Sequence, residues 1–172
     1  PYADSFPVMV QKKLQNIYEA TVGVRNVAVG GWATVNGLHA FDERVLAEKA
    51  DLMILGYGMN DRGTPLDQYK QMIADMVCRF KKFNPDGEVV LVAPMLPNVE
   101  TDWLKNQPLF AEKLYELEKE YPFVAVADMT QMHWDILATG KRYRDMTGNN
   151  INHPNDFIAR VYAQVILKTL LG

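Results

Sequence analysis

Glu88-Val89-Val90-Leu91-Val92-Ala93 is the stretch of sequence that decides the fold. A continuous apolar run of this length is typical of a strand in a parallel sheet whose two faces are both covered. The run follows Asn84-Pro85-Asp86-Gly87, a strong turn signal that ends the helix predicted before it. A helix, a tight turn and a buried strand in this order predict an α/β protein.

Segments of helical and strand character alternate along the rest of the chain. Helices are predicted over residues 6–20, 38–49, 66–83, 107–121, 131–138 and 155–171, and further strands over 24–29, 51–56 and 123–126. This alternation predicts a three-layer, doubly wound α/β fold, a parallel sheet between two layers of helices. No repeat or linker interrupts it, so residues 1–172 are predicted to form a single domain.

The composition limits the classes of function. A length of 172 residues with 48% hydrophobic residues is enough for one sizeable core. The formal net charge of -3, with Lys and Arg clustered only in short groups, argues against nucleic acid as a partner. No apolar run approaches the length of a membrane-spanning helix.

Several reactive residue types are expected to have structural roles. Cys78 lies in an apolar helical pattern and is predicted to be a buried, inert thiol. His39 and His133 lie within predicted helices without acidic neighbours at ligand spacing, so no metal site is expected. No cofactor is expected either, because no Gly-rich phosphate loop opens a helix. The chain has one serine, Ser5, which is predicted to cap the helix that begins with Phe6-Pro7.

Three stretches lie at the ends of predicted strands or before the last helix: residues 26–31, whose Gly30-Gly31 follows a predicted strand, and residues 58–61 and 150–155. In a doubly wound domain, ligands bind beyond the carboxyl ends of the strands. The three stretches are therefore expected to meet at one edge of the sheet.

Each stretch supplies a group with a chemical use and a simpler structural alternative. Gly31 allows a backbone N–H to face a ligand, although Gly30-Gly31 also suits a tight turn. The Asn60 amide can donate to a developing oxyanion, although Gly58-Met59-Asn60-Asp61 also suits an Asx-turn. A histidine in general titrates near neutrality, so His153 suits a general base, although a lone histidine more often packs or caps.

Together, Gly31, Gly58-Met59-Asn60-Asp61 and Asn152-His153-Pro154-Asn155 resemble the motifs of the SGNH hydrolases, also called the GDSL esterase/lipase family. The resemblance runs from Ser5 to the C-terminus and implies a flavodoxin-like fold. It implies that the Gly31 N–H and the Asn60 amide stabilise the oxyanion, that His153 is the base, and that a serine in a Gly-Asp-Ser block is the nucleophile.

Two positions depart from the family pattern. The Gly-Asp-Ser block and its central strand are absent, so we expect that residue 1 is not the natural start and that an upstream segment carries both. Asn150 stands where the family has an aspartate three residues before the histidine. Because asparagine brings no charge, the hypothesis is a Ser–His dyad oriented by Asn150 or a backbone carbonyl.

The resemblance implies ester hydrolysis through an acyl-enzyme. Without a long apolar lid, a small acyl group such as acetyl on a carbohydrate is the expected substrate, and Trp32, Tyr57, Trp103 and Tyr143 could either stack on a sugar or pack in the core. The alternative is a non-catalytic carbohydrate-binding or scaffolding relative that lost its serine. A flavodoxin-like nucleotide binder is a weaker third reading.

Overall fold

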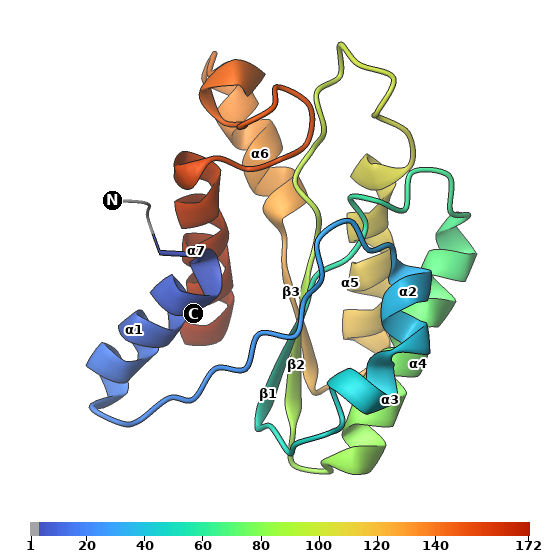
Figure 1. Ribbon diagram of the computed structural model, residues 1–172, viewed down its shortest axis with the longest axis vertical. Coiled ribbons are helices and arrows are strands. Elements are labelled where there is room, and N and C mark those ends of the chain that lie inside the picture. Colours follow the sequence, from blue (N-terminus) through green and yellow to red (C-terminus); the bar gives the residue numbers. More distant parts are fainter. Residues whose placement is uncertain (1–3) are drawn as a thin grey trace.

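A parallel sheet of three strands forms the centre of the computed structural model, which describes residues 4–172 (Figure 1). The strands are β1 (Leu52–Leu55), β2 (Glu88–Val92) and β3 (Val124–Ala127), in the order β1-β2-β3. Leu52 pairs with Glu88, and Val89 pairs with Val124. The parallel α/β architecture predicted from the alternating pattern is confirmed.

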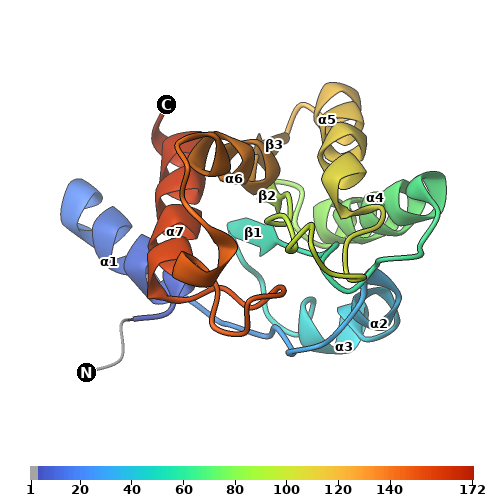
Figure 2. The same ribbon diagram turned by 90° about the horizontal axis from the view of Figure 1, so that it is seen from above.

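Helices cover both faces of the sheet, which gives three layers (Figure 2). One layer holds α2 (Thr34–His39), α3 (Phe41–Arg44), α4 (Leu66–Phe83) and α5 (Phe110–Glu120). The other holds α1 (Phe6–Tyr18), α6 (Met129–Ala138) and α7 (Asp156–Leu171). Short 3-10 turns occupy Gln107–Leu109 and Tyr143–Asp145.

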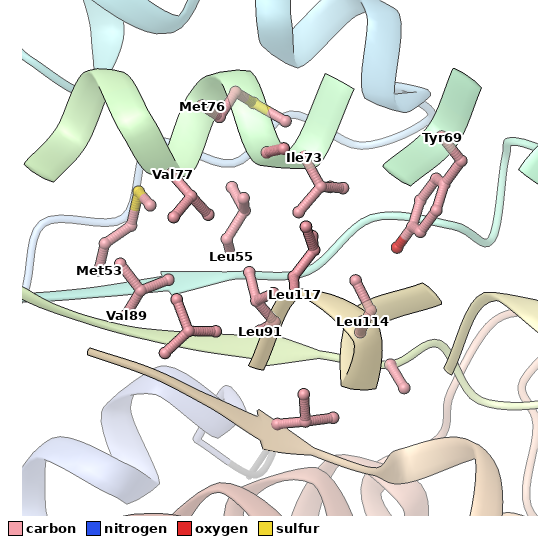
Figure 3. Close-up of a cluster of buried hydrophobic side chains, with 14 of the residues drawn as sticks. Met53, Leu55, Tyr69, Ile73, Met76, Val77, Val89, Leu91, Leu114 and Leu117 are labelled. Carbon is pink, nitrogen blue, oxygen red and sulfur yellow. The ribbon is translucent and has the colours of Figure 1, made fainter. Parts of the chain in front are cut away.

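Alternate side chains of the strands build two hydrophobic clusters, one on each face of the sheet. Met53, Leu55, Val89 and Leu91 pack against buried residues of α4 and α5 (Figure 3). On the other face, Val90 and Val92 pack with residues of α6 and α7. Because both faces of β2 are buried, this strand reads as a continuous apolar run.

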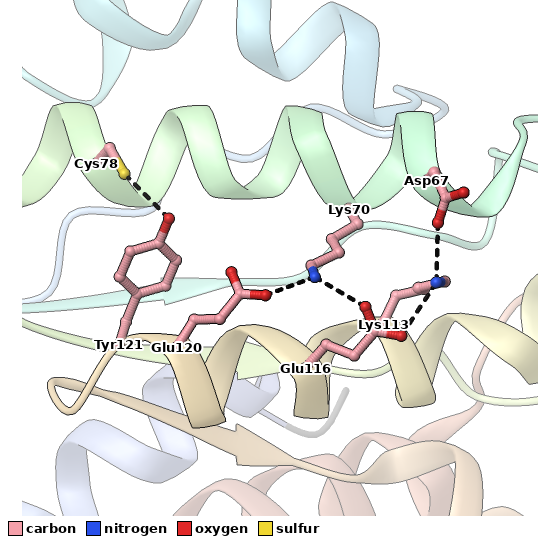
Figure 4. A network of polar contacts seen from close by, with 7 residues as sticks. All are labelled: Asp67, Lys70, Cys78, Lys113, Glu116, Glu120 and Tyr121. Atoms are coloured by element: carbon pink, nitrogen blue, oxygen red, sulfur yellow. Dashed lines mark hydrogen bonds and ion pairs between the residues drawn. The ribbon is translucent and has the colours of Figure 1, made fainter.

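A network of ion pairs joins α4 to α5 at the surface (Figure 4). Lys70 contacts Glu116 at 2.8 Å and Glu120 at 2.6 Å. Lys113 contacts Asp67 at 2.9 Å and Glu116 at 3.0 Å. Hydrogen bonds from both lysines lower the pKa of Glu116.

Cys78 lies beside this network and is exposed, with its sulfur 3.5 Å from the Tyr121 hydroxyl. The prediction of a buried thiol is therefore wrong. Cys78 lies one position beyond the buried pair Met76 and Val77, on the flank of α4 near the end of α5. The apolar pattern alone did not locate the boundary of the buried face.

The predicted strand over residues 24–29 is also wrong, because this segment pairs with no strand of residues 4–172. Arg25 donates to the carbonyls of Arg44 and Val45 at 2.8 Å, and the Arg44 guanidinium donates back to the Val27 carbonyl. These bonds hold the segment against the end of α3. The three-stranded sheet fits the expected absence of a central strand between this segment and β1.

The helix predicted over residues 38–49 is replaced by α2 and α3, which meet at Ala40. The Asp61 carboxylate accepts a hydrogen bond from the Thr34 N–H at 2.9 Å and so fixes the start of α2 four residues earlier than predicted. The other helices agree closely with the prediction. Helix α4 has the predicted bounds, and the Asn155 side chain caps α7 by accepting hydrogen bonds from the N–H groups of Phe157 and Ile158.

No helix within residues 4–172 has the length and apolar character needed to cross a membrane.

His133 is fully buried in α6 as a neutral side chain. Its Nδ1 accepts a hydrogen bond from the Leu96 N–H at 3.0 Å, and burial lowers its pKa from 6.5 to about 4. The pKa of His133 is lower in the folded protein than in the unfolded chain. The stability that depends on neutral His133 is therefore fully present above pH 6.5 and is lost as the pH falls toward about 4. We therefore expect the free energy of unfolding to fall by up to about 3 kcal/mol across this window because of His133, at about 1.4 kcal/mol for each pKa unit.

Urea unfolding at pH 7, 5.5 and 4 measures this loss. The His133→Gln variant, which keeps an acceptor for Leu96, should show a shallower dependence on pH. The exposed His39 provides the matched control, and His39→Gln should follow the wild-type curve. Equal slopes for wild type and His133→Gln would contradict the assignment.

Candidate active site

Gly30-Gly31 and the stretches 58–61 and 150–155 lie toward the carboxyl edge of the sheet, the upper edge in Figure 1. The turn 58–61 follows β1, the segment 24–29 leads into Gly30-Gly31, and the loop 146–155 joins the second 3-10 turn to α7. The topology thus brings the predicted site residues to one edge of the molecule.

Gly31 and Asn60 are held next to each other through Trp32. The Asn60 amide nitrogen donates one hydrogen bond to the Trp32 carbonyl at 3.1 Å, which leaves its second hydrogen free. Gly31 has φ 81°, a conformation that favours glycine, and its N–H donates to no residue of the described chain. Two neighbouring hydrogen-bond donors without full partners are therefore present at this edge of the sheet.

Asp61 is the anchor of this arrangement and is 2% exposed. Its carboxylate accepts from the N–H groups of Thr34, at 2.9 Å, and Gly58, at 3.1 Å, and so ties the turn after β1 to the start of α2. Burial raises its pKa, while these backbone donors favour the ionised form. Gly58 has φ 121°, and a Cβ there would lie 2.9 Å from Pro94, so only glycine fits the turn.

The loop that carries His153 is organised by Asn149. The Asn149 side-chain oxygen accepts from the backbone N–H groups of Ile151, Asn152 and His153, each at 3.0 Å. Gly148 donates to the His153 carbonyl at 2.9 Å, so the backbone of His153 is fixed on both sides. The His153 side chain is exposed at this edge.

Asn150 has φ 56°, and its carbonyl accepts from the Asn98 amide at 2.9 Å. Asn98 also donates its N–H to the Ile151 carbonyl at 2.8 Å, so the loop is fastened to the segment after β2. Within residues 4–172, no hydrogen bond joins the side chains of Asn150 and His153, and none joins His153 to Gly31 or Asn60.

Ser5 lies at the start of α1, away from this arrangement of donors (Figure 1). It occupies the N-cap position with Pro7 in the first turn, as predicted. Its side chain makes no capping hydrogen bond, however, and only its carbonyl is used, accepting from Met9 at 3.1 Å.

The four aromatic side chains considered as stacking surfaces are largely engaged in packing. Tyr57 lies against Gly37, where a Cβ would come within 2.0 Å of its hydroxyl. The Arg62 guanidinium stacks on Trp103 at 4.4 Å, and Tyr143 is buried. Trp32 is half-buried with Arg44 over its ring at 5.5 Å.

The chain is similar to known hydrolases in sequence and in fold. The model of the GDSL-like Lipase/Acylhydrolase family matches residues 2–161. No curated protein is similar enough in sequence to match. Among solved structures, Axe2, an acetylxylan esterase from Geobacillus stearothermophilus, aligns with 99% of this chain over 82% of its own chain, at 17% identity and TM-score 0.84.

A second structure, LAE5, an alpha/beta hydrolase enzyme from the metagenome of Lake Arreo in Spain, aligns with 96% of this chain over 80% of its own, at 16% identity and TM-score 0.81. Other structures are of catalytic mutants of Axe2 in which a serine, an aspartate or a histidine is replaced by alanine. At these identities the structural likeness shows the fold, and the family model shows the family.

Proposed function

Because the chain belongs to the GDSL-like lipase/acylhydrolase family of carboxylic ester hydrolases, we propose that it removes small acyl groups, such as acetyl on a carbohydrate, through an acyl-enzyme. The observation that carries this proposal is the pair of open donors, the Gly31 N–H and the second Asn60 amide hydrogen. Donors fixed in place before reaction stabilise a developing oxyanion without reorganising.

In this proposal, His153 is the general base. A serine oxygen attacks the ester carbonyl carbon while His153 takes the serine proton, and the oxyanion forms beside Gly31 and Asn60. His153 then gives the proton to the departing alcohol as the ester C–O bond breaks. Water repeats the sequence on the acyl-enzyme and releases the acid.

The serine is proposed to reside on an extended segment that lies between β1 and residues 24–29 and precedes Pro1 in the natural sequence. Within residues 4–172, β1 pairs on one side alone, and Val24, Val29 and Ile54 are 46%, 36% and 39% exposed. An added parallel strand would use the free edge of β1 and cover apolar surface. Its carboxyl end would then lie at the edge that holds Gly31 and Asn60.

Asn150 is the proposed orienting residue for His153, through its side-chain carbonyl, in a dyad without a charged third member. Hydrogen bonds of catalytic groups are often long before substrate binds, and the Asn98 contact holds Asn150 in the same loop. The missing charge is expected to lower the base strength of the imidazole relative to a site with an aspartate.

Hydrolysis rates for a series of 4-nitrophenyl esters test the proposed substrate class in the complete gene product. We expect kcat/KM to be highest for the acetyl ester and to fall as the acyl chain lengthens, since the sequence shows no long apolar lid segment that would cover a long acyl chain. The likeness to an acetylxylan esterase fold supports the same order. Turnover of long-chain esters without turnover of the acetyl ester would contradict the proposal.

A further inference from the structure

A pocket of about 350 Å³ opens beside the His153 loop. It lies between the segment after β2, which contributes Asn98 and Glu100, and the stretch from Arg142 to Asn150. Asn150 lines it, so the pocket borders the loop 146–155 that carries His153. Its volume falls within the range of small-molecule sites, about 300–1,000 Å³.

Two charged side chains of opposite sign line this pocket without ion-pair partners in residues 4–172. Arg144 and Glu100 make no ion pair or side-chain hydrogen bond there. Arg142 is different, because it contacts Asp145 at 3.3 Å. The pocket therefore presents the unpaired guanidinium group of Arg144 and the unpaired carboxylate of Glu100.

Tyr143 also lines the pocket, and its side chain packs against His133 of α6. It is 9% exposed, and its hydroxyl is buried without a hydrogen-bond partner in the described chain. Its ring lies edge-on to His133 at 5.4 Å, and the His133 Nε2 also lacks a partner there. Buried polar groups are almost always hydrogen-bonded, and an enclosed water is the usual partner of such atoms.

We propose that this pocket holds the sugar ring of the ester's alcohol half and recognises neighbouring hydroxyl groups with Arg144 and Glu100. A hydroxyl donates and accepts at once, so a pair of hydroxyls can satisfy a carboxylate and a guanidinium together. An anionic ligand would face Glu100, and a cationic ligand would face both arginines. This assignment rests on the proposed esterase function and names the part of the substrate that the pocket selects.

The test compares two acetyl esters in the complete gene product: an acetylated xylo-oligosaccharide and 4-nitrophenyl acetate, which has no sugar. For Arg144→Ala and for Glu100→Gln, we expect the ratio of kcat/KM values, sugar ester over aryl ester, to fall at least about tenfold, mainly through KM. Arg160→Ala removes an exposed arginine of α7 outside the pocket and should leave the ratio unchanged. Arg144→Lys should recover part of the loss.

An unchanged ratio in both pocket variants, or an equal loss on both esters, would overturn the sugar assignment. If wild type hydrolyses neither ester, the proposed function fails, and calorimetric binding of the unacetylated xylo-oligosaccharide decides the pocket separately. Binding that is lost in Arg144→Ala would support the pocket, and no binding to wild type would overturn it.

Discussion

Replacement of His153 by alanine is expected to lower kcat for 4-nitrophenyl acetate by about 10²- to 10⁴-fold in the complete gene product, the usual contribution of a positioned general base. The side chain is exposed and makes no hydrogen bond within residues 4–172, while the loop is held by backbone bonds to Asn149. The variant should therefore keep the wild-type melting temperature. A loss of activity without a loss of stability separates a chemical role from a structural one.

The matched control is His39→Ala, because His39 is an exposed histidine at the end of α2. It should retain wild-type kcat. Steady-state rates and thermal melts of both variants provide the measurement. Retention of most of the activity in His153→Ala would remove His153 from the mechanism.

Asn150→Asp extends the same experiment to the orienting position. A carboxylate facing the imidazole would stabilise the imidazolium that forms during turnover, so kcat would rise and the pH profile of kcat/KM would change. An unchanged rate and pH profile would show that the side chain at position 150 does not act on His153.

Replacement of Asp61 by alanine is expected to be the most damaging change to the scaffold of the site. It leaves the buried N–H groups of Thr34 and Gly58 without an acceptor, which costs about 2–5 kcal/mol of the free energy of unfolding. The same bonds hold the turn that carries Asn60 against the Gly31 segment. In the protein that remains folded, kcat should therefore fall by about 10²-fold or more.

Asp67→Ala is the control, since Asp67 is an exposed aspartate whose contact is the surface ion pair with Lys113 at 2.9 Å. It should cost less than about 1 kcal/mol. Asp61→Asn, which keeps one acceptor oxygen, should lie between the two. Urea unfolding measures all three, and a cost for Asp61→Ala equal to that for Asp67→Ala would contradict the anchoring role.

Helices and strands could be predicted from the sequence where the local hydrophobic pattern matches the tertiary surroundings of the element. The strand over residues 88–93 reads as buried on both faces, and helices α4 and α5 flank it as predicted. The segment 24–29 has the same local character, but a strand exists only with a partner, and here arginine bonds to α3 hold the chain instead. The division of the predicted helix 38–49 likewise depends on Asp61, more than ten residues away.

At the candidate site, too, the features that depend on tertiary contacts could not be predicted from local sequence. Asn60 follows β1 and His153 precedes α7, as predicted, whereas the strand expected before Gly31 is not formed; the catalytic roles of all three residues stay predictions. The role of Asn149 was missed, although an asparagine shortly before a histidine in an irregular loop is a signal for an Asx-turn. The pocket of Arg144 and Glu100 joins two segments far apart in the sequence, so no local pattern could have indicated it.

Labelling of the complete gene product with a fluorophosphonate serine probe, mapped by mass spectrometry, tests the central claim most directly. We expect one labelled serine, upstream of Pro1, and loss of the label in His153→Ala. Label on Ser5 would contradict the proposed position of the nucleophile. No label in protein shown to be folded would contradict the acyl-enzyme mechanism and favour a binding domain that lost its serine.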